Sequence, residues 1–471
     1  MGTEKRMCRN EMQERLDKIF QGYDVRGIYP DEYDTDVAYR LGRAAVEFCG
    51  AERVIIGRDM RRGGPELFSA LANGAIDQGA DVTDAGMCSS DALYHAGADG
   101  GYDLSLMVTA SHNPAEFNGT KIVQSDGTSV GKNSGLLEIK KMVLEGAFPE
   151  AGGRGTFRND EGVMERFIDY ALGFIDPDNL TPLKIVVDAG NGMGGVLTEL
   201  LRAHVPFEII PINFEPDGTF PAHDPDPTRP ECVEILRQRV REENADLGLG
   251  FDGDADRAAL IDEKGGLING SELGSVLARK ILARQPGAKI SYCLVSSWTI
   301  RDTIEDHGGQ PVITPVGGAN IRQVMKEEDI VLATERSGHY YLKENHLADS
   351  GLIAALMALE DLCQEGCTLS ELIDPYRKYR MAPELSILLG TPESSVSELD
   401  EIKREKMQRA NEFAQGAEVI VRNEPRFEFK DWWFCVRPSG TEPRRLRMTV
   451  EAKTQEQLDE RYEQVKALLA E

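Results

Sequence analysis

The sequence predicts an α/β protein with three related α/β domains followed by a smaller α+β domain. Its 471 residues are too many for one ordinary hydrophobic core, and that length suggests about three or four domains. Three stretches repeat the order of apolar strand, amphipathic helix and second strand, which is the order of a βαβ unit. The C-terminal part follows another order, so we expect a domain of a different build there.

Each repeated unit spans roughly 30 residues. Their wide spacing indicates separate domains rather than a solenoid. In every unit a run of apolar residues is followed by a helical pattern and then by a second short apolar run. The expected strand, helix and strand of the three units lie at 53–57, 65–78 and around Val82; at 183–188, 193–203 and 207–210; and at 290–295, 299–307 and 312–313.

The C-terminal part begins with a polar, charged segment at 394–415 that predicts a helix. Apolar runs at 418–421, 427–436 and 446–451 predict strands, and a last helix is expected at 455–470. The segment 375–379 is the expected linker. The predicted domain boundaries are therefore 15–158, 159–266, 267–374 and 375–471.

The composition is that of a globular protein without membrane or nucleic-acid contacts. Hydrophobic residues make up 41% and charged residues 28% of the chain. No apolar run reaches the roughly 18 residues that a membrane helix needs, and the polar first residues lead into no signal segment. The net charge of −27 argues against nucleic acid as a partner, because binding it needs basic patches. The eight cysteines are scattered and form no zinc motif, which favours free thiols in a reducing, cytoplasmic setting.

A small nucleophile stands where an apolar strand ends. The run 104–108 predicts a short buried strand, and Ser111 and His112 follow it in a loop that closes on the turn signal Asn113-Pro114. A serine at the carboxyl end of a strand is placed to meet a substrate. Taken alone, such a pair is more often a local hydrogen bond within a turn than a catalytic site.

Three carboxylates alternate in a second loop, which lies between two apolar runs that predict strands. Asp252, Asp254 and Asp256 would repel one another unless a cation lay between them, and oxygen ligands select hard metals, chiefly Mg²⁺ or Ca²⁺. An EF-hand is excluded because Arg257 takes the position where its sharp turn needs glycine, and because the flanks are not helical. The competing interpretation is a solvated acidic turn.

Two further loops follow predicted strands and carry groups suited to a phosphorylated sugar. In the loop 334–339 a carboxylate, a hydroxyl and an imidazole suit vicinal sugar hydroxyls, although an exposed polar turn would look the same. In the loop 437–444, backbone N–H groups could form an anion-binding nest, and an arginine could bind phosphate through two parallel hydrogen bonds. The alternative is a β-turn whose arginines have no binding role. The side chains concerned are Glu335, Ser337 and His339 in the first loop, and Arg437, Ser439, Gly440 and Thr441 in the second.

Together these loops resemble those of the α-D-phosphohexomutase superfamily, and most closely its phosphomannomutase/phosphoglucomutase branch. They come in the family's order, one per domain, and the resemblance runs from Tyr23 to about Glu451. It implies three α/β domains with mixed sheets and a C-terminal α+β domain around a central cleft. It also implies that Ser111 is phosphorylated in the resting enzyme. The three aspartates would then hold one Mg²⁺ that also contacts this phosphoserine.

The resemblance assigns further roles to single residues. It implies that the loop 334–339 binds sugar hydroxyls through Glu335, Ser337 and His339. The loop 437–444 would bind the non-reacting phosphate through Arg437, Ser439, Gly440 and Thr441. Arg26 and Lys121 would lie beside the reacting groups. Tyr23, His112 and Arg257 fall on family positions near the phosphoserine or the substrate.

Two departures from the family pattern leave the sugar preference open. Thr334 stands where glycine is usual, and Arg336 stands where methionine or glutamine is usual. The segment 316–320 offers no histidine where the family often has Gly-His.

The implied reaction moves a phosphoryl group between the 1- and 6-hydroxyls of a hexose phosphate, with mannose, glucose or both as the sugar. Hexose 1,6-bisphosphate would be the intermediate and activator. Lys121 is the expected base, which would require a lowered pKa. The alternative within the class is a phosphoglucosamine mutase. The alternative of another class is a non-catalytic sugar-phosphate or Ca²⁺-binding protein on the same fold. The expected assembly is a monomer or a homodimer.

Overall fold

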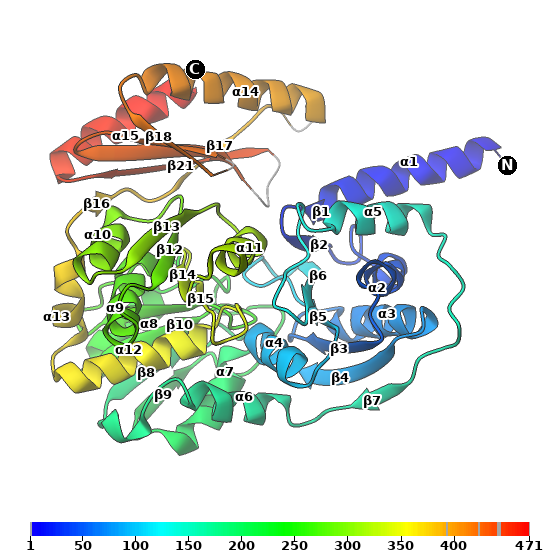
Figure 1. Cartoon of the computed structure of the whole chain (residues 1–471), viewed down its shortest axis with the longest axis horizontal. Helices are drawn as coiled ribbons and strands as arrows, with labels where there is room; N and C mark the ends of the chain where they lie inside the picture. Colours follow the sequence, from blue (N-terminus) through cyan, green and yellow to red (C-terminus); the bar gives the residue numbers. More distant parts are fainter. Residues whose placement is uncertain (1, 392–393, 423, 440–443, 471) are drawn as a thin grey trace.

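The computed structural model describes residues 2–391, 394–422, 424–439 and 444–470. Its strands form four sheets that follow one another along the chain. The first three sheets mix parallel and antiparallel neighbours, and the fourth is antiparallel throughout the described strands, which confirms the predicted fold class. In Figure 1 the orange and red C-terminal domain lies above the green and yellow ones, and the blue domain lies beside them. Among the described helices, none is both long and apolar enough to cross a membrane.

The first sheet has seven strands in the order β1-β2-β6-β5-β3-β4-β7. Its central strand β5 (Leu104–Val108) is buried along its whole length, because helices cover both faces of the sheet. Leu106 packs into one core and Met107 into the other, as strand alternation requires. The first predicted βαβ unit is present as β3, α3 and β4. The elements are α1 (Gly2–Ile19), β1 (Phe20–Gln21), β2 (Asp24–Ile28), α2 (Thr35–Cys49), β3 (Arg53–Arg58), α3 (Gly64–Asp77), β4 (Asp81–Met87), α4 (Ser90–Asp99), β6 (Phe117–Gln124), α5 (Leu136–Glu145) and β7 (Phe157–Asn159).

The second sheet has the order β11-β10-β8-β9 and contains the second predicted unit as β8, α7 and β9. The strands β10 and β11 pair antiparallel, so the acidic loop between them is a hairpin end and not the loop of a helical Ca²⁺ site. The elements are α6 (Val163–Leu172), β8 (Lys184–Asp188), α7 (Gly194–Leu201), β9 (Glu208–Ile212), α8 (Glu234–Glu243), β10 (Leu247–Phe251) and β11 (Ala258–Asp262), with short 3-10 turns at Pro177–Asn179 and Arg202–His204.

The third sheet has the order β13-β12-β14-β15 and contains the third unit as β12, α10 and β13. The antiparallel pair β14 and β15 carries the loop 335–339 at its turn. The elements are α9 (Gly270–Arg284), β12 (Lys289–Cys293), α10 (Trp298–Asp306), β13 (Gln310–Thr314), α11 (Gly318–Glu328), β14 (Leu332–Thr334), β15 (Tyr340–Leu342), α12 (Gly351–Glu365), α13 (Leu369–Ile373) and a 3-10 turn at Asp374–Tyr376.

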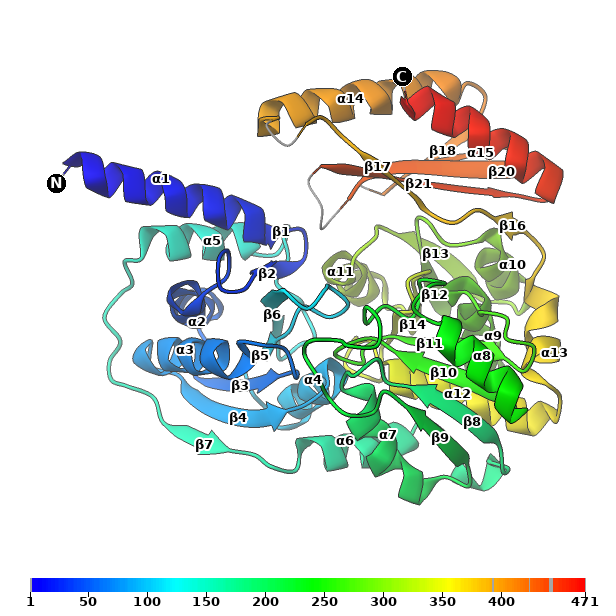
Figure 2. The same ribbon diagram turned by 180° about the vertical axis from the view of Figure 1, so that it is seen from behind.

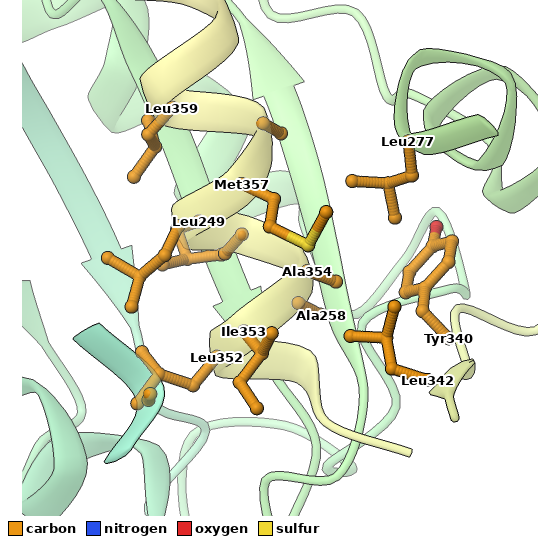
Figure 3. Packing of buried hydrophobic residues seen from close by; sticks show 14 of the residues in the cluster. Leu249, Ala258, Leu277, Tyr340, Leu342, Leu352, Ile353, Ala354, Met357 and Leu359 are labelled. Carbon is orange, nitrogen blue, oxygen red and sulfur yellow. The ribbon is translucent and has the colours of Figure 1, made fainter. Parts of the chain in front are cut away.

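One hydrophobic core joins the first three domains. Figure 3 shows side chains of the helix α12 packed among Leu249 and Ala258 of the second sheet and Leu277 and Tyr340 of the third domain. Residues of the first sheet and of α4 and α6 belong to the same core. The loops of these three domains are therefore held against one another by continuous packing.

The C-terminal sheet has the order β16-β21-β20-β19-β18, with β17 also paired to β21. Figure 2 shows α14 and α15 on its outer face, so its other face looks toward the third domain. The single strand expected at 427–436 is wrong: Lys430 and Asp431 form a polar turn, and the Phe429 N–H donates to the Trp432 carbonyl at 2.8 Å. The elements are β16 (Arg380–Met381), β17 (Leu385–Leu388), α14 (Val396–Phe413), β18 (Glu418–Arg422), β19 (Glu424–Glu428), β20 (Trp432–Pro438), β21 (Arg445–Ala452) and α15 (Gln455–Ala470).

Candidate active site

Ser111 is held in a strained turn directly after β5. Its φ of 50° lies in the left-handed region, which residues other than glycine rarely adopt. The Ser111 N–H donates to the Thr109 hydroxyl at 2.9 Å, and this hydroxyl donates to Asp59 at 2.6 Å. The residue is 2% exposed. The turn therefore fixes the direction of the Ser111 hydroxyl.

The Ser111 hydroxyl points to the acidic loop of the second domain. Its Oγ lies 3.0 Å from an Asp252 oxygen and 3.2 Å from His112 Nδ1. The two loops touch so closely that a Cβ at Gly253 would lie 2.5 Å from the Ser111 carbonyl oxygen. Because any larger residue at Gly253 would push the loops apart, this glycine sets the distance between hydroxyl and carboxylate.

The acidic triad is a buried and incompletely satisfied cluster. Ligand oxygens of Asp252, Asp254 and Asp256 lie within 4.8 Å of one another. Burial, followed by the neighbouring Asp256, raises the pKa of Asp252 to about 7. One oxygen each of Asp254 and Asp256 is buried with no hydrogen-bond partner among the described residues. Buried carboxylate oxygens without partners, converging at this spacing, fit a hard divalent cation such as Mg²⁺.

Lys121 faces the same triad from β6. Its Nζ lies 2.6 Å from Asp254 and 2.5 Å from Asp256. Burial alone would lower the Lys121 pKa, but the two carboxylates raise it well above its ordinary value. This direction is opposite to the lowered pKa expected for Lys121 as a base, and the role of Lys121 stays a prediction.

Two arginines flank the Ser111 turn. Arg26 pairs with Asp24 at 2.7 Å and donates to the Ala110 carbonyl at 3.1 Å. Arg257 pairs with Asp252 at 2.9 Å and with Asp226 at 3.3 Å. Burial, followed by the nearby Arg257 charge, lowers the pKa of His112 well below its ordinary value. The imidazole beside Ser111 is accordingly neutral.

The loop 334–339 is anchored within its own domain and to the second domain. Glu335 is 4% exposed and accepts hydrogen bonds from the Gly317 N–H at 3.2 Å and the Tyr341 hydroxyl at 3.1 Å. The Ser337 carbonyl lies 3.4 Å from Arg257, which links this loop to the Ser111 turn.

His339 links the sugar loop to the acidic triad. Its Nδ1 lies 2.6 Å from Asp349 and 3.9 Å from Asp256. Burial opposes protonation of His339, but the hydrogen bond with Asp349 outweighs it and raises the pKa. His339 therefore lies between two carboxylates that favour its protonated form.

Tyr23 and Arg437 complete the predicted set from the first and last domains. The Tyr23 hydroxyl donates to the Val316 carbonyl at 2.9 Å, and burial raises its pKa to about 12. Arg437 and Glu335 both lie near enough to act on that pKa. Arg437 pairs with Glu384 at 3.1 Å.

The last predicted site residues lie in the loop after β20. The Ser439 N–H donates to the Arg445 carbonyl at 2.9 Å, which closes the base of this loop. Gly440 and Thr441 lie outside the described residues. Among the residues that the structure describes, no hydrogen bond or ion pair joins Arg437 to the network around Ser111.

Comparison with known proteins identifies the family. Sequence models described as phosphoglucomutase/phosphomannomutase alpha/beta/alpha domains I, II and III match residues 17–150, 165–266 and 269–379, and the C-terminal domain matches 393–468. The chain belongs to the phosphoglucomutase/phosphomannomutase family. This confirms the α-D-phosphohexomutase superfamily, and the protein is a phosphohexomutase, an isomerase.

Relatives of this phosphohexomutase match it over nearly the whole length. It is 35% identical over 460 residues to a phosphomannomutase of Escherichia coli, covering 96% of this chain and 98% of the relative. It is 35% identical over 440 residues to phosphohexose mutases of Xanthomonas campestris, covering 92% and 95%. A phosphoglucomutase/phosphomannomutase family protein of Burkholderia thailandensis has a similar structure, with a TM-score of 0.85 at 30% identity, covering 96% and 97%.

The structure of this phosphohexomutase also shows one residue beside Ser111, Arg61, that the sequence analysis missed. Arg61 is fully buried and donates to the carbonyls of Ser111 and Asn113 at 2.7 and 2.6 Å. It also donates to the Pro114 and Phe117 carbonyls at 2.9 and 3.0 Å. Arg61 follows the carboxyl end of β3, so the reasoning that selected Ser111 at the end of β5 could have found it.

The departures from the family pattern have local explanations in this phosphohexomutase. Thr334 is buried at the end of β14 and donates to the Ser291 carbonyl at 3.4 Å. A Cβ at Gly317 would lie 2.1 Å from the Tyr23 ring, so the segment 316–320 is shaped to admit that ring. The Arg336 side chain extends away from the loop 334–339 and donates a hydrogen bond to the carbonyl of Ala382, in the C-terminal domain, at 3.3 Å.

Proposed function

We propose that this phosphohexomutase interconverts hexose 6-phosphate and hexose 1-phosphate, with mannose, glucose or both as the sugar, through a phosphoserine at Ser111 and a hexose 1,6-bisphosphate. The observation that carries the proposal is the 3.0 Å distance between the Ser111 hydroxyl and Asp252 of the acidic triad. A phosphoryl group on that hydroxyl would stand among the cationic side chains of Lys121, Arg26 and Arg257.

The transfer exchanges one phosphate ester bond for another. The free hydroxyl of the bound sugar phosphate attacks phosphorus, and the bond between phosphorus and Ser111 Oγ breaks. The proton of the attacking hydroxyl ends on Ser111 Oγ, next to the neutral His112 imidazole at 3.2 Å. The bisphosphate then turns over and returns its other phosphoryl group to Ser111.

Asp252, Asp254 and Asp256 would hold the Mg²⁺. When bound, this ion supplies a positive charge that makes the phosphoryl group a better acceptor. Lys121 contributes as a cation that balances the charge of the triad and of the transferring group. This role needs no deprotonated amine.

The sugar and the non-reacting phosphate bind on the third and fourth domains. Glu335, Ser337 and His339 would bind the hydroxyls, and Arg437, Ser439, Gly440 and Thr441 would bind the phosphate across the central cleft. We keep the domain boundaries 15–158, 159–266, 267–374 and 375–471 and a cytoplasmic monomer or homodimer as part of this proposal.

Side-by-side assays test the function. Mannose 1-phosphate, glucose 1-phosphate and glucosamine 6-phosphate are offered to the wild type with Mg²⁺ and hexose 1,6-bisphosphate. We expect turnover of mannose 1-phosphate, glucose 1-phosphate or both, and loss of this activity in Ser111→Ala with retention of the fold. Preferred turnover of glucosamine 6-phosphate would establish the phosphoglucosamine mutase instead, and no turnover of any sugar would favour a binding protein.

A further inference from the structure

The arginine proposed to bind phosphate is already paired with a carboxylate of its own domain. Arg437 lies 3.1 Å from one oxygen of Glu384, and the other oxygen lies 3.7 Å from Arg447. The Arg437 and Glu384 side chains are 12% and 25% exposed. A carboxylate offers a guanidinium the same kind of charged acceptor as a phosphate does. An arriving phosphate therefore competes with Glu384 for Arg437.

A third arginine reaches the same carboxylate region from the sugar loop. Arg336 donates to the Ala382 carbonyl at 3.3 Å, two residues before Glu384. Its second terminal nitrogen is buried with no hydrogen-bond partner within the described ranges. Burial lowers the Arg336 pKa, and Glu384 is the strongest charge that opposes this effect. A buried guanidinium N–H without a partner is unfavourable, so an acceptor that can move to it will be drawn there.

We propose that Glu384 is a positioning residue that holds Arg437 while phosphate is absent and turns to Arg336 when phosphate takes its place. The inference rests on the proposed phosphate-binding role of Arg437. The like charges of phosphate and carboxylate drive Glu384 away, and Arg336 receives it. Because Arg336 lies between Glu335 and Ser337, occupancy of the phosphate site is coupled to the loop that binds the sugar.

Glu384→Gln tests the exchange, with Glu424→Gln as its matched control. Glu424 also lies near Arg437, whose charge opposes the rise that burial causes in the Glu424 pKa, but no ion pair joins the two in the part of the chain described. Both variants remove one negative charge near Arg437, but only Glu384→Gln breaks an ion pair with Arg437.

The measurement is calorimetric titration of the full chain with inorganic phosphate. Arg437→Met identifies the site, because the signal from it should be lost. We expect Glu384→Gln to bind phosphate about three- to tenfold more tightly than Glu424→Gln. The KM for the hexose phosphate should fall by a similar factor, with a smaller change in kcat. Arg336→Met, which takes away the second position of Glu384, should weaken phosphate binding about threefold or more.

Binding by Glu384→Gln that is equal to or weaker than that of Glu424→Gln would overturn the exchange, as would unchanged binding in Arg336→Met. These outcomes differ from a failure of the proposed function. In that case Arg437→Met would bind phosphate as the wild type does, or the wild type would show no mutase turnover. Circular dichroism of every variant excludes misfolding as the cause of a loss.

Discussion

At the scale of single residues, buried arginine side chains hold the loop that carries Ser111 in place. Arg61 holds four backbone carbonyls of the Ser111 loop, and Arg26 holds another. Positive side chains directed at backbone carbonyls fix a loop in a strained conformation without using the groups that react. The strained φ of Ser111 is maintained in this way.

Arg61→Met should destabilise the fold and disable the site. It leaves Asp59 buried without its ion pair, which costs about 3 to 5 kcal/mol. Thermal unfolding should show the loss, and kcat should fall. The double variant Arg61→Met/Asp59→Asn removes the unpaired charge, so it should regain stability but not kcat. Full activity in the double variant would show that Arg61 does not position Ser111.

Lys121 is predicted to act as a cation. Lys121→Arg keeps the positive charge, and Lys121→Met removes it. The kcat of Lys121→Arg should therefore exceed that of Lys121→Met by about tenfold or more. A lysine side chain with an ordinary pKa stays protonated below about pH 9, so a cationic Lys121 should add no ionisation to the wild-type kcat between about pH 6 and 9. Equal inactivity of both variants, together with a wild-type ionisation that both abolish, would restore Lys121 as the base.

Mg²⁺ should stabilise the protein more strongly as pH rises. An unfolded Asp loses its proton near pH 4, whereas Asp252 in the folded chain holds it to about 7. Between about pH 4 and pH 7 the folded state binds more protons than the unfolded state, so the stability that Asp252 contributes falls as pH rises. The Asp252 carboxylate that has lost its proton is then free to bind the metal. The rise in Tm caused by Mg²⁺ should be larger at about pH 8 than at about pH 6. Asp252→Asn should abolish this difference, and equal shifts at both pH values in the wild type would contradict the account.

At the scale of helices and strands, apolar patterns predicted the three βαβ units and several C-terminal elements, and a polar turn caused the error in one predicted strand. The three βαβ units and the helix α14 follow from periodicity, and the Ser395 and Glu398 capping box marks where α14 begins. The pattern missed the turn at Lys430 and Asp431, because aromatic residues on both sides continue the apolar run.

The site was predictable only in part. Ser111 and the triad follow strand ends in the sequence, so their loops could be selected from pattern alone. The contacts of Arg61, Glu384 and Arg336 join segments that lie far apart in the chain. The spacing of residues along the sequence does not predict such tertiary contacts.

The helix α12 should determine the stability of the first three domains together. Ile353 is fully buried in the core shown in Figure 3, and its replacement by alanine should cost about 2 to 5 kcal/mol. Calorimetry should show the loss in the transition of this large unit. The matched variant Leu446→Ala lies in the separate C-terminal core and should lower a different transition. A single transition shifted equally by both variants would contradict two cooperative units.

At the scale of the whole molecule, the first three domains share a hydrophobic core, and the C-terminal domain has a core of its own. Arg426 donates to the carbonyls of Leu294 and Ser296 at 3.1 and 2.8 Å, and Glu451 accepts from the Trp298 N–H at 2.9 Å. These buried contacts join the C-terminal domain to the start of α10. The Ser111 turn and the acidic triad thus belong to the three domains that share a core, whereas Arg437 belongs to the C-terminal domain.

The central claim is that Ser111 carries the phosphoryl group that the substrate receives. Purified wild-type protein is incubated with hexose 1,6-bisphosphate and Mg²⁺, and its intact mass and peptides are measured before and after addition of excess hexose 1-phosphate. We predict one added phosphoryl group, located at Ser111, that substrate removes, and none in Ser111→Ala. A fully active enzyme without phosphate on Ser111, or a phosphoserine that substrate leaves untouched, would contradict the account.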